Sequence, residues 1–216
     1  MANKIEIIEE WVRTLKIKKF AHGFDHTDRV RKWMLKIAKA ERYSKLDVAE
    51  AAALFHDVGR SQPDDDHGES GAQLAQAFLD RNNLFEKSEV QEIVNAVRFH
   101  NKDRRGEGKL LDILRDADIL DLLGAMGIIR EAMSDYHLTM FDNKNVKGET
   151  WGMTAKDFDE RIDSGRGRGE TISDQLNFQI SCYDNLKSKY AIKMAQPMVE
   201  FMRDFLEQLE KEAKQQ

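Results

Sequence analysis

The stretch LFHDVGR, residues 54–60, ends an apolar run that begins at Ala49. A run with this spacing of apolar residues is typical of a buried helix, so His56 and Asp57 are expected in its final turn. Gly59 is expected to end the helix in the left-handed conformation and to let the backbone bend, so that both polar side chains turn to one point. The stretch therefore predicts a helix that delivers a histidine and an aspartate to the same place.

Amphipathic helices are also predicted on the amino-terminal side of this stretch. Residues 4–15 carry an apolar stripe at helical spacing. A second helix is predicted to begin near Asp25, which places His26 in its first turn. Ser44, followed three residues later by Asp47, predicts a capping box at the start of the next helix.

The helical pattern continues on the carboxyl-terminal side. Residues 61–66 are predicted to form a loop, a helix resumes at His67, and Ser88 is the predicted cap of a helix that ends at His100. Residues 110–129 are the most apolar run in the chain, yet the run contains Asp112, Asp116, Asp118 and Asp121. At least some of these carboxylates are expected to face the interior, and buried charge requires a partner.

The last third of the chain shows a weaker pattern. Residues 142–152 and 165–169 are predicted to be irregular, and two helices are predicted to close the chain. The final helix carries a stripe of large apolar residues at helical spacing: Met194, Met198, Phe201, Phe205 and Leu209. This stripe is expected to be core or the surface of a homodimer, and not a ligand site.

Composition bounds the class of protein. Helical spacing almost throughout and only two prolines predict an all-α fold, and a length of 216 residues favours a single domain over residues 1–216. The net charge of −5 with mixed signs argues against a duplex nucleic-acid or anionic-membrane partner. No transmembrane run or signal peptide is recognisable, so a cytoplasmic protein is expected. The single cysteine, Cys182, is expected to be packing.

One set of residues combines into a candidate metal site. His26 opens a helix, His56 and Asp57 end another, and Asp118 lies in the most apolar helix. Imidazole nitrogen together with carboxylate oxygen suits manganese, iron, zinc or nickel. An ion at this point would also explain a carboxylate in an apolar helix.

The segments GFDHTDRV, LFHDVGR, HGESGA, VRFHN and RDADILDLLGAMGIIR resemble the small stand-alone hydrolases of the HD superfamily of metal-dependent phosphohydrolases. The resemblance covers about residues 20–132 and implies an HD-domain helical bundle there, with residues 133–216 as a helical extension. Its implied metal ligands are His26, His56, Asp57 and Asp118. Asp116 and Asp121 are expected to orient ligands or fix the helix.

His67 and His100 leave two alternatives open. In two-metal HD phosphodiesterases, histidines at comparable positions complete a second site, with Asp57 bridging the two ions. Alternatively, His67 at a helix N-terminus binds a substrate phosphate, and His100 is placed favourably at a helix C-terminus. The sequence therefore predicts one or two divalent ions.

Basic residues flank the proposed site. Arg60 follows the His-Asp pair directly and is predicted to bind the substrate phosphate, because arginine suits bidentate phosphate contacts. Lys102, Arg104 and Arg105 are expected to be solvent-facing loop charges. The two remaining histidines, His22 and His137, are expected to be surface or structural residues.

The expected activity is metal-dependent hydrolysis of a phosphoester or phosphoanhydride bond in a small molecule. The resemblance implies a nucleotide as substrate. Asp57 is expected to orient the attacking water, and His67, His100 or Arg60 is expected to stabilise charge on the leaving group or the phosphoryl oxygens. The alternative is a non-catalytic sensor that binds a metal or a nucleotide, because no catalytic acid is unambiguous.

Overall fold

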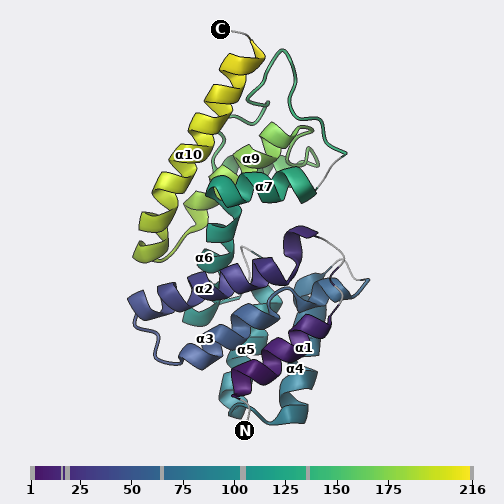
Figure 1. The fold of residues 1–216 in the computed structure, drawn as a ribbon, viewed down its shortest axis with the longest axis vertical. Helices are drawn as coiled ribbons and strands as arrows, with labels where there is room; N and C mark the ends of the chain where they lie inside the picture. The colour runs from purple at the N-terminus through teal and green to yellow at the C-terminus, as the bar shows by residue number, and fades with distance from the viewer. Residues whose placement is uncertain are drawn as a thin grey trace. The chain divides into compact units, whose positions relative to one another are not determined.

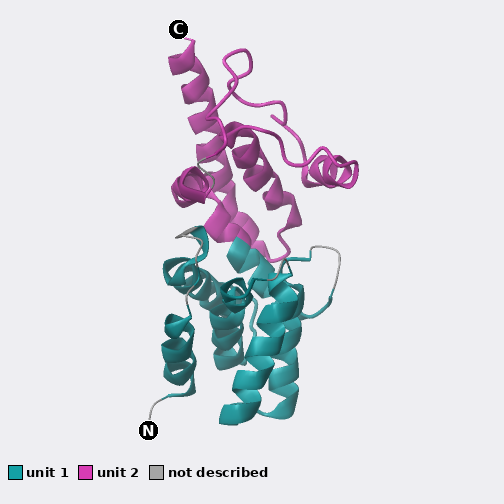
Figure 2. Cartoon of the chain, turned by 90° about the vertical axis from the view of Figure 1, so that its right-hand side faces the viewer, with its two compact units in different colours: residues 1–118 teal, residues 119–216 magenta. Residues whose placement is uncertain are grey.

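The structure is a computed structural model that describes residues 3–15, 17, 20–63, 66–102, 106–134 and 137–214. The chain divides into two compact units, Met1–Asp118 and Ile119–Gln216 (Figure 2). The described residues form α-helices, short 3-10 helices and loops with two isolated β-bridges, so the predicted all-α fold is confirmed. The single-domain assignment stays a prediction.

The first unit is built from five helices and most of a sixth (Figure 1). These are α1 Lys4–Thr14, α2 Phe24–Ala40, α3 Leu46–Phe55, α4 His67–Asn82, α5 Lys87–Phe99 and α6 Lys109–Leu122, with two 3-10 segments, η1 Phe20–His22 and η2 Val58–Ser61. Helix α3 packs against α1, α2 and α5. Every side chain from Ala51 to Phe55 is fully buried, so α3 is the core helix of this unit.

The predicted starts of two helices are wrong. Helix α3 has Lys45 as its N-cap, without a side-chain hydrogen bond, so Ser44 and Asp47 form no capping box. In α5, the capping box is made by Glu86 and Glu89 and not by Ser88. The chain enters α5 through the extended backbone of Glu86, two residues before the predicted cap, and its carboxylate serves as the acceptor.

Gly59 acts through close packing, and the predicted left-handed conformation is wrong, because its φ angle is not positive. A Cβ atom at Gly59 would lie 2.0 Å from the carbonyl oxygen of His67 and 2.6 Å from the backbone nitrogen of Gly71. Only a residue without a side chain allows η2 to approach the first turn of α4 this closely. Gly59 thereby brings His67 near the His-Asp pair.

The second unit contains the last turn of α6 and four further helices: α7 Gly124–Ser134, α8 Ala155–Asp163, α9 Ile172–Ser181 and α10 Lys189–Ala213, with the 3-10 segment η3 Cys182–Asn185. The apolar run of residues 110–129 forms parts of two helices, because Gly124 has a φ angle of +72° and turns the chain between α6 and α7. Three helices follow residue 154, so the prediction of two closing helices missed α8.

Buried Asp174 organises the irregular segments of the second unit. Its carboxylate accepts hydrogen bonds from the backbone N–H and hydroxyl of Thr150 and from those of Thr171. Gly148 and Gly169, both with positive φ, pass so close that a Cβ atom on either would lie within 2.5 Å of the Asp174 side chain. The segments predicted to be irregular are therefore tied to α9 by one carboxylate.

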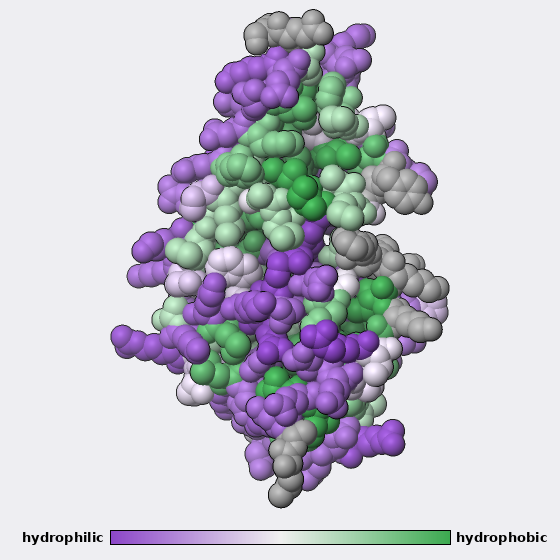
Figure 3. All heavy atoms as spheres, in the orientation of Figure 1, coloured by the Kyte–Doolittle hydropathy of each residue, from purple (hydrophilic) through white to green (hydrophobic). Residues whose placement is uncertain are grey.

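The second unit also exposes apolar side chains. Met126, Ile129 and Met133 follow one another along α7 and are 44–58% exposed, and Figure 3 shows apolar residues gathered over this helix. In the predicted stripe of α10, Phe201 and Phe205 are exposed, whereas the buried face of α10 is formed by other residues. No described helix is both long and apolar enough to cross a membrane.

Candidate metal centre

Asp57 lies at the point where α3 ends and η2 begins, and its side chain is 3% exposed. The preceding residue, His56, is fully buried, and its Nδ1 donates to the carbonyl oxygen of Ala53 at 2.7 Å. A neutral imidazole that donates through Nδ1 keeps a lone pair on Nε2. The last turn of α3 therefore holds His56 as a preoriented ligand.

Four ligand atoms converge on one side of Asp57. Nε2 of His26 lies 3.1 Å from Nε2 of His56 and 3.5 Å from Oδ1 of Asp118. Oδ2 of Asp57 lies 3.6 Å from the His26 nitrogen and 3.7 Å from the His56 nitrogen. Ligand atoms about 2.1 Å from one ion are roughly 3.0–3.5 Å apart, so the separations of 3.1–3.7 Å in this cluster are close to those of one coordination shell.

The other carboxylate oxygen of Asp57, Oδ1, faces a second group of side chains. Nε2 of His67 lies 3.5 Å away, Nε2 of His100 lies 3.7 Å away, and Nε of Arg60 donates a hydrogen bond at 2.7 Å. The Nδ1 atom of His100 bonds the carbonyl oxygen of Val97, as His56 bonds its own helix. The structure thus brings His67 and His100 together at Asp57, on the side occupied by Arg60.

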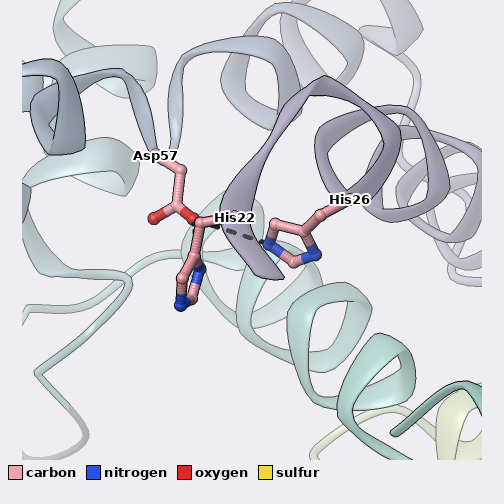
Figure 4. Close-up of side chains that lie close together, drawn as sticks. All are labelled: His22, His26 and Asp57. Atoms are coloured by element: carbon pink, nitrogen blue, oxygen red, sulfur yellow. Dashed lines mark hydrogen bonds and ion pairs between the residues drawn. The ribbon is translucent and has the colours of Figure 1, made fainter. Parts of the chain in front are cut away.

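His22 belongs to the site, although its sequence context gave no reason to expect it. Its Nδ1 lies 2.9 Å from Oδ2 of Asp57, and its ring stands edge-on to that of His26 at 5.6 Å between centroids. Figure 4 shows both imidazoles beside the Asp57 carboxylate. The spacing of four residues between His22 and His26 was the available signal, but His22 lies in η1, outside the predicted helix.

The electrostatics of the cluster keep the carboxylates of Asp57 and Asp118 ionised and His56 neutral. Burial opposes ionisation of Asp57, but the histidines and Arg60 around it hold its pKa well below the usual value. Burial likewise opposes ionisation of Asp118, and His26 and His56 lower its pKa overall. Burial lowers the pKa of His56 to about 4. Anionic carboxylates and neutral imidazoles are the forms that bind metal ions.

Two neighbouring aspartates are more deeply buried than the proposed ligand Asp118, whose side chain is 30% exposed. Asp116 is completely buried in α6. In the second unit, Asp121 accepts a hydrogen bond from Nη1 of Arg130 at 2.9 Å, and both residues are buried. Asp121, which was predicted to fix the helix, thus pairs with Arg130, a residue that the sequence pattern did not single out.

The remaining predicted residues lie at the edge of the site or away from it. Lys102 donates to Oδ2 of Asp66, the N-cap residue of α4, at 2.7 Å. Arg104 and Arg105 lie outside the described residues. His137 is exposed, as a surface histidine should be.

The HD domain family matches residues 23–126. Residues 23–126 form an HD domain. The match begins three residues before His26 and ends eight residues after Asp118, so the HD domain contains all four predicted ligands as well as His67 and His100. His22 lies one residue before the matched range. No curated protein matches the chain.

Several solved structures have the same fold and align with nearly the whole chain. A Lactobacillus plantarum protein aligns with 100% of this chain and 99% of its own at 20% identity, with a TM-score of 0.75. YpgQ from Bacillus subtilis, solved in complex with ADP, aligns with 97% and 94% at 21% identity and a TM-score of 0.67. A predicted HD superfamily hydrolase from an uncultured Thermotogales bacterium aligns with 94% and 89% at 26% identity and a TM-score of 0.61.

Proposed function

We propose that this HD-domain protein is a metal-dependent hydrolase that cleaves a phosphoester or phosphoanhydride bond of a small molecule. The observation that carries the proposal is the environment of Asp57. Its Oδ2 atom faces the nitrogens of His26 and His56, whereas its Oδ1 atom faces Arg60 and His67. One carboxylate therefore joins a candidate metal-binding group of side chains to a permanent cation, Arg60, and an imidazole, His67, which together suit a phosphate group.

The residues that would hold the ion are His26, His56, Asp57 and Asp118, because their ligand atoms have the separations of one coordination shell. Manganese, iron, nickel and zinc all accept this set of nitrogen and oxygen donors. When bound, such an ion polarises phosphoryl oxygens and makes a water molecule acidic enough to supply hydroxide near neutral pH.

The side chains around the ion site have distinct tasks in this proposal. Asp57 positions the attacking water, because it is buried and ionised at the centre of the cluster. Arg60 and His67 hold the phosphoryl group beside it, since both lie next to Oδ1 of Asp57, Arg60 on η2 and His67 at the start of α4. Lys102, anchored by Asp66 one residue before His67, adds positive charge at the rim.

A nucleotide is the proposed class of substrate. Its support comes from YpgQ, whose structure was solved with ADP and which shares the fold of this chain at 21% identity. A net charge of −5 argues against duplex nucleic acid, which generally requires a broad basic surface. The two local cations, Arg60 and Lys102, suit the few negative charges of a small phosphorylated molecule.

We also propose that the chain forms a homodimer through its exposed apolar residues on α7 and α10.

The test is release of inorganic phosphate or pyrophosphate from a pooled panel of nucleotides, with added manganese. Turnover that is abolished by a chelator and by the Asp57→Asn substitution is expected. Tight metal or nucleotide binding without any turnover across the panel would instead favour the non-catalytic sensor. Phosphate or pyrophosphate as the released product identifies which bond is cleaved.

A further inference from the structure

We propose that Arg60 takes the place of a second metal ion at Oδ1 of Asp57, so that the site holds one divalent ion per chain. The inference rests on the proposed function only in assigning the first ion to His26, His56 and Asp118 together with Asp57. It concerns how many ions bind and which side chain sets that number, and it is independent of the substrate.

The position of Arg60 is the first observation. Its Nε atom donates to Oδ1 of Asp57 at 2.7 Å, shorter than the distances from the same oxygen to His67 and His100. Arg60 follows Asp57 by three residues along η2, so the local backbone turns its side chain back onto the carboxylate. A guanidinium stays protonated in proteins, so it is a permanent cation on the oxygen that a second ion would need.

The hydrogen bonding of His67 is the second observation. The side-chain nitrogen of Asn101 lies 3.4 Å from Nδ1 of His67. With the Asn101 amide in this orientation its nitrogen donates, so a neutral His67 accepts at Nδ1 and carries its proton on Nε2. That buried Nε2 has no hydrogen-bond partner among the described residues and lies near Asp57 as an N–H group, without the lone pair that a metal ion requires. His56 and His100 have the opposite tautomer, because each bonds a carbonyl oxygen through Nδ1.

The supply of anionic ligands is the third observation. The groups that face Oδ1 of Asp57 are two histidines and one arginine, and the described residues add no further carboxylate to this cluster. One divalent ion already balances the charges of Asp57 and Asp118. A second ion would meet Arg60 with no anion left to balance it, so repulsion disfavours its binding.

The experiment counts bound ions without any substrate. The protein is freed of metal by chelation, dialysed against cobalt(II) at increasing concentrations, and analysed for cobalt per chain. The unmodified protein is expected to bind one ion. Arg60→Gln, which removes the charge and keeps a polar side chain, is expected to bind a second ion on the order of 100-fold more tightly than the unmodified protein does. Arg60→Lys, which keeps the charge, is expected to bind one.

A double variant locates the second ion. Adding His100→Ala to Arg60→Gln is expected to return the count to one, because it removes the remaining imidazole lone pair beside Oδ1 of Asp57. Circular dichroism and thermal unfolding establish that each variant is folded, and Arg60→Ala replaces Arg60→Gln if that variant is not.

Three results would overturn the inference: two ions in the unmodified protein, one ion in the folded single variant Arg60→Gln or Arg60→Ala, or no ion in the unmodified protein. Failure to hydrolyse any nucleotide would not contradict the inference about the number of ions, because the experiment measures metal content.

Discussion

The Nε2 atoms of His26 and His56 lie 3.1 Å apart, although His26 belongs to α2 and His56 to the end of α3. The Nε2 atom of His56 bears a lone pair, because its Nδ1 is bonded to a backbone carbonyl. Two imidazole nitrogens at this distance are stable together when a proton or a cation lies between them. Without a metal ion, a neutral His26 that carries its proton on Nε2 donates to His56, and a divalent ion bound by both lone pairs would replace that hydrogen bond.

Asp118→Ala is expected to abolish tight metal binding, because the change removes one of two anionic ligands from the proposed site. Changing a residue that only orients a metal ligand costs about 10–100-fold in affinity, so removing a ligand itself is expected to cost at least about 100-fold. Elemental analysis after dialysis against manganese measures it. Asp112→Ala is the matched control on the same helix, since Asp112 belongs to none of the metal-binding clusters among the described residues. Full metal occupancy in Asp118→Ala would contradict the assignment.

The metal-free protein is expected to lose stability as the pH falls from about 6.5 to about 4. Burial lowers the pKa of both His56 and His67 to about 4 in the folded chain, whereas the value in an unfolded chain is about 6.5. The unfolded state therefore binds more protons between these limits, so the free energy of unfolding rises with pH there and is lost on acidification.

Urea unfolding of the metal-free protein at a series of pH values measures this loss, which is expected to total several kcal/mol and at most about 7 kcal/mol. His56→Ala is the control variant, and its unfolding free energy should depend less on pH across the same range. An unfolding free energy that stays constant from pH 6.5 to pH 4 in the metal-free protein would contradict the burial of neutral histidines.

Gly59→Ala is expected to destabilise the protein and to displace the start of α4, because its Cβ would lie 2.0 Å from the carbonyl oxygen of His67. Overpacking against backbone that cannot move away costs about 1–3 kcal/mol or more. Gly71→Ala is a graded control in the same contact, since its nearest neighbour would be 3.2 Å away. Chemical unfolding of both variants should show the larger loss for Gly59→Ala. Equal losses would mean that the approach of η2 to α4 is not what requires glycine.

The sequence pattern predicted the positions of His26, His56 and Asp118 because helical periodicity and an apolar context are local properties. It could not assign the cap of α5, because Ser88 and Glu86 are both plausible acceptors and the backbone path selects between them. It also missed His22, since the approach of η1 to Asp57 is a contact between residues 35 apart in the chain. Long-range packing therefore brings together candidate ligands that were individually recognisable in the sequence.

Asp121→Ala is expected to destabilise the second unit more than a typical surface substitution does. Asp121 and Arg130 are buried and form an ion pair, so removing the carboxylate leaves the Arg130 guanidinium without it in the interior. Breaking a buried pair from one side costs about 3–5 kcal/mol, whereas replacing both partners by apolar residues is often neutral.

The double variant Asp121→Leu with Arg130→Met tests this explanation directly. Urea unfolding should show most of the stability restored, because no unpaired charge remains buried. Metal content should stay unchanged in both the single and the double variant, since Asp121 bonds Arg130 and is not among the atoms that converge near Asp57. If Asp121→Ala lost its metal while keeping its stability, Asp121 would be a residue of the metal centre, and the helix-fixing role argued from its bond to Arg130 would be wrong.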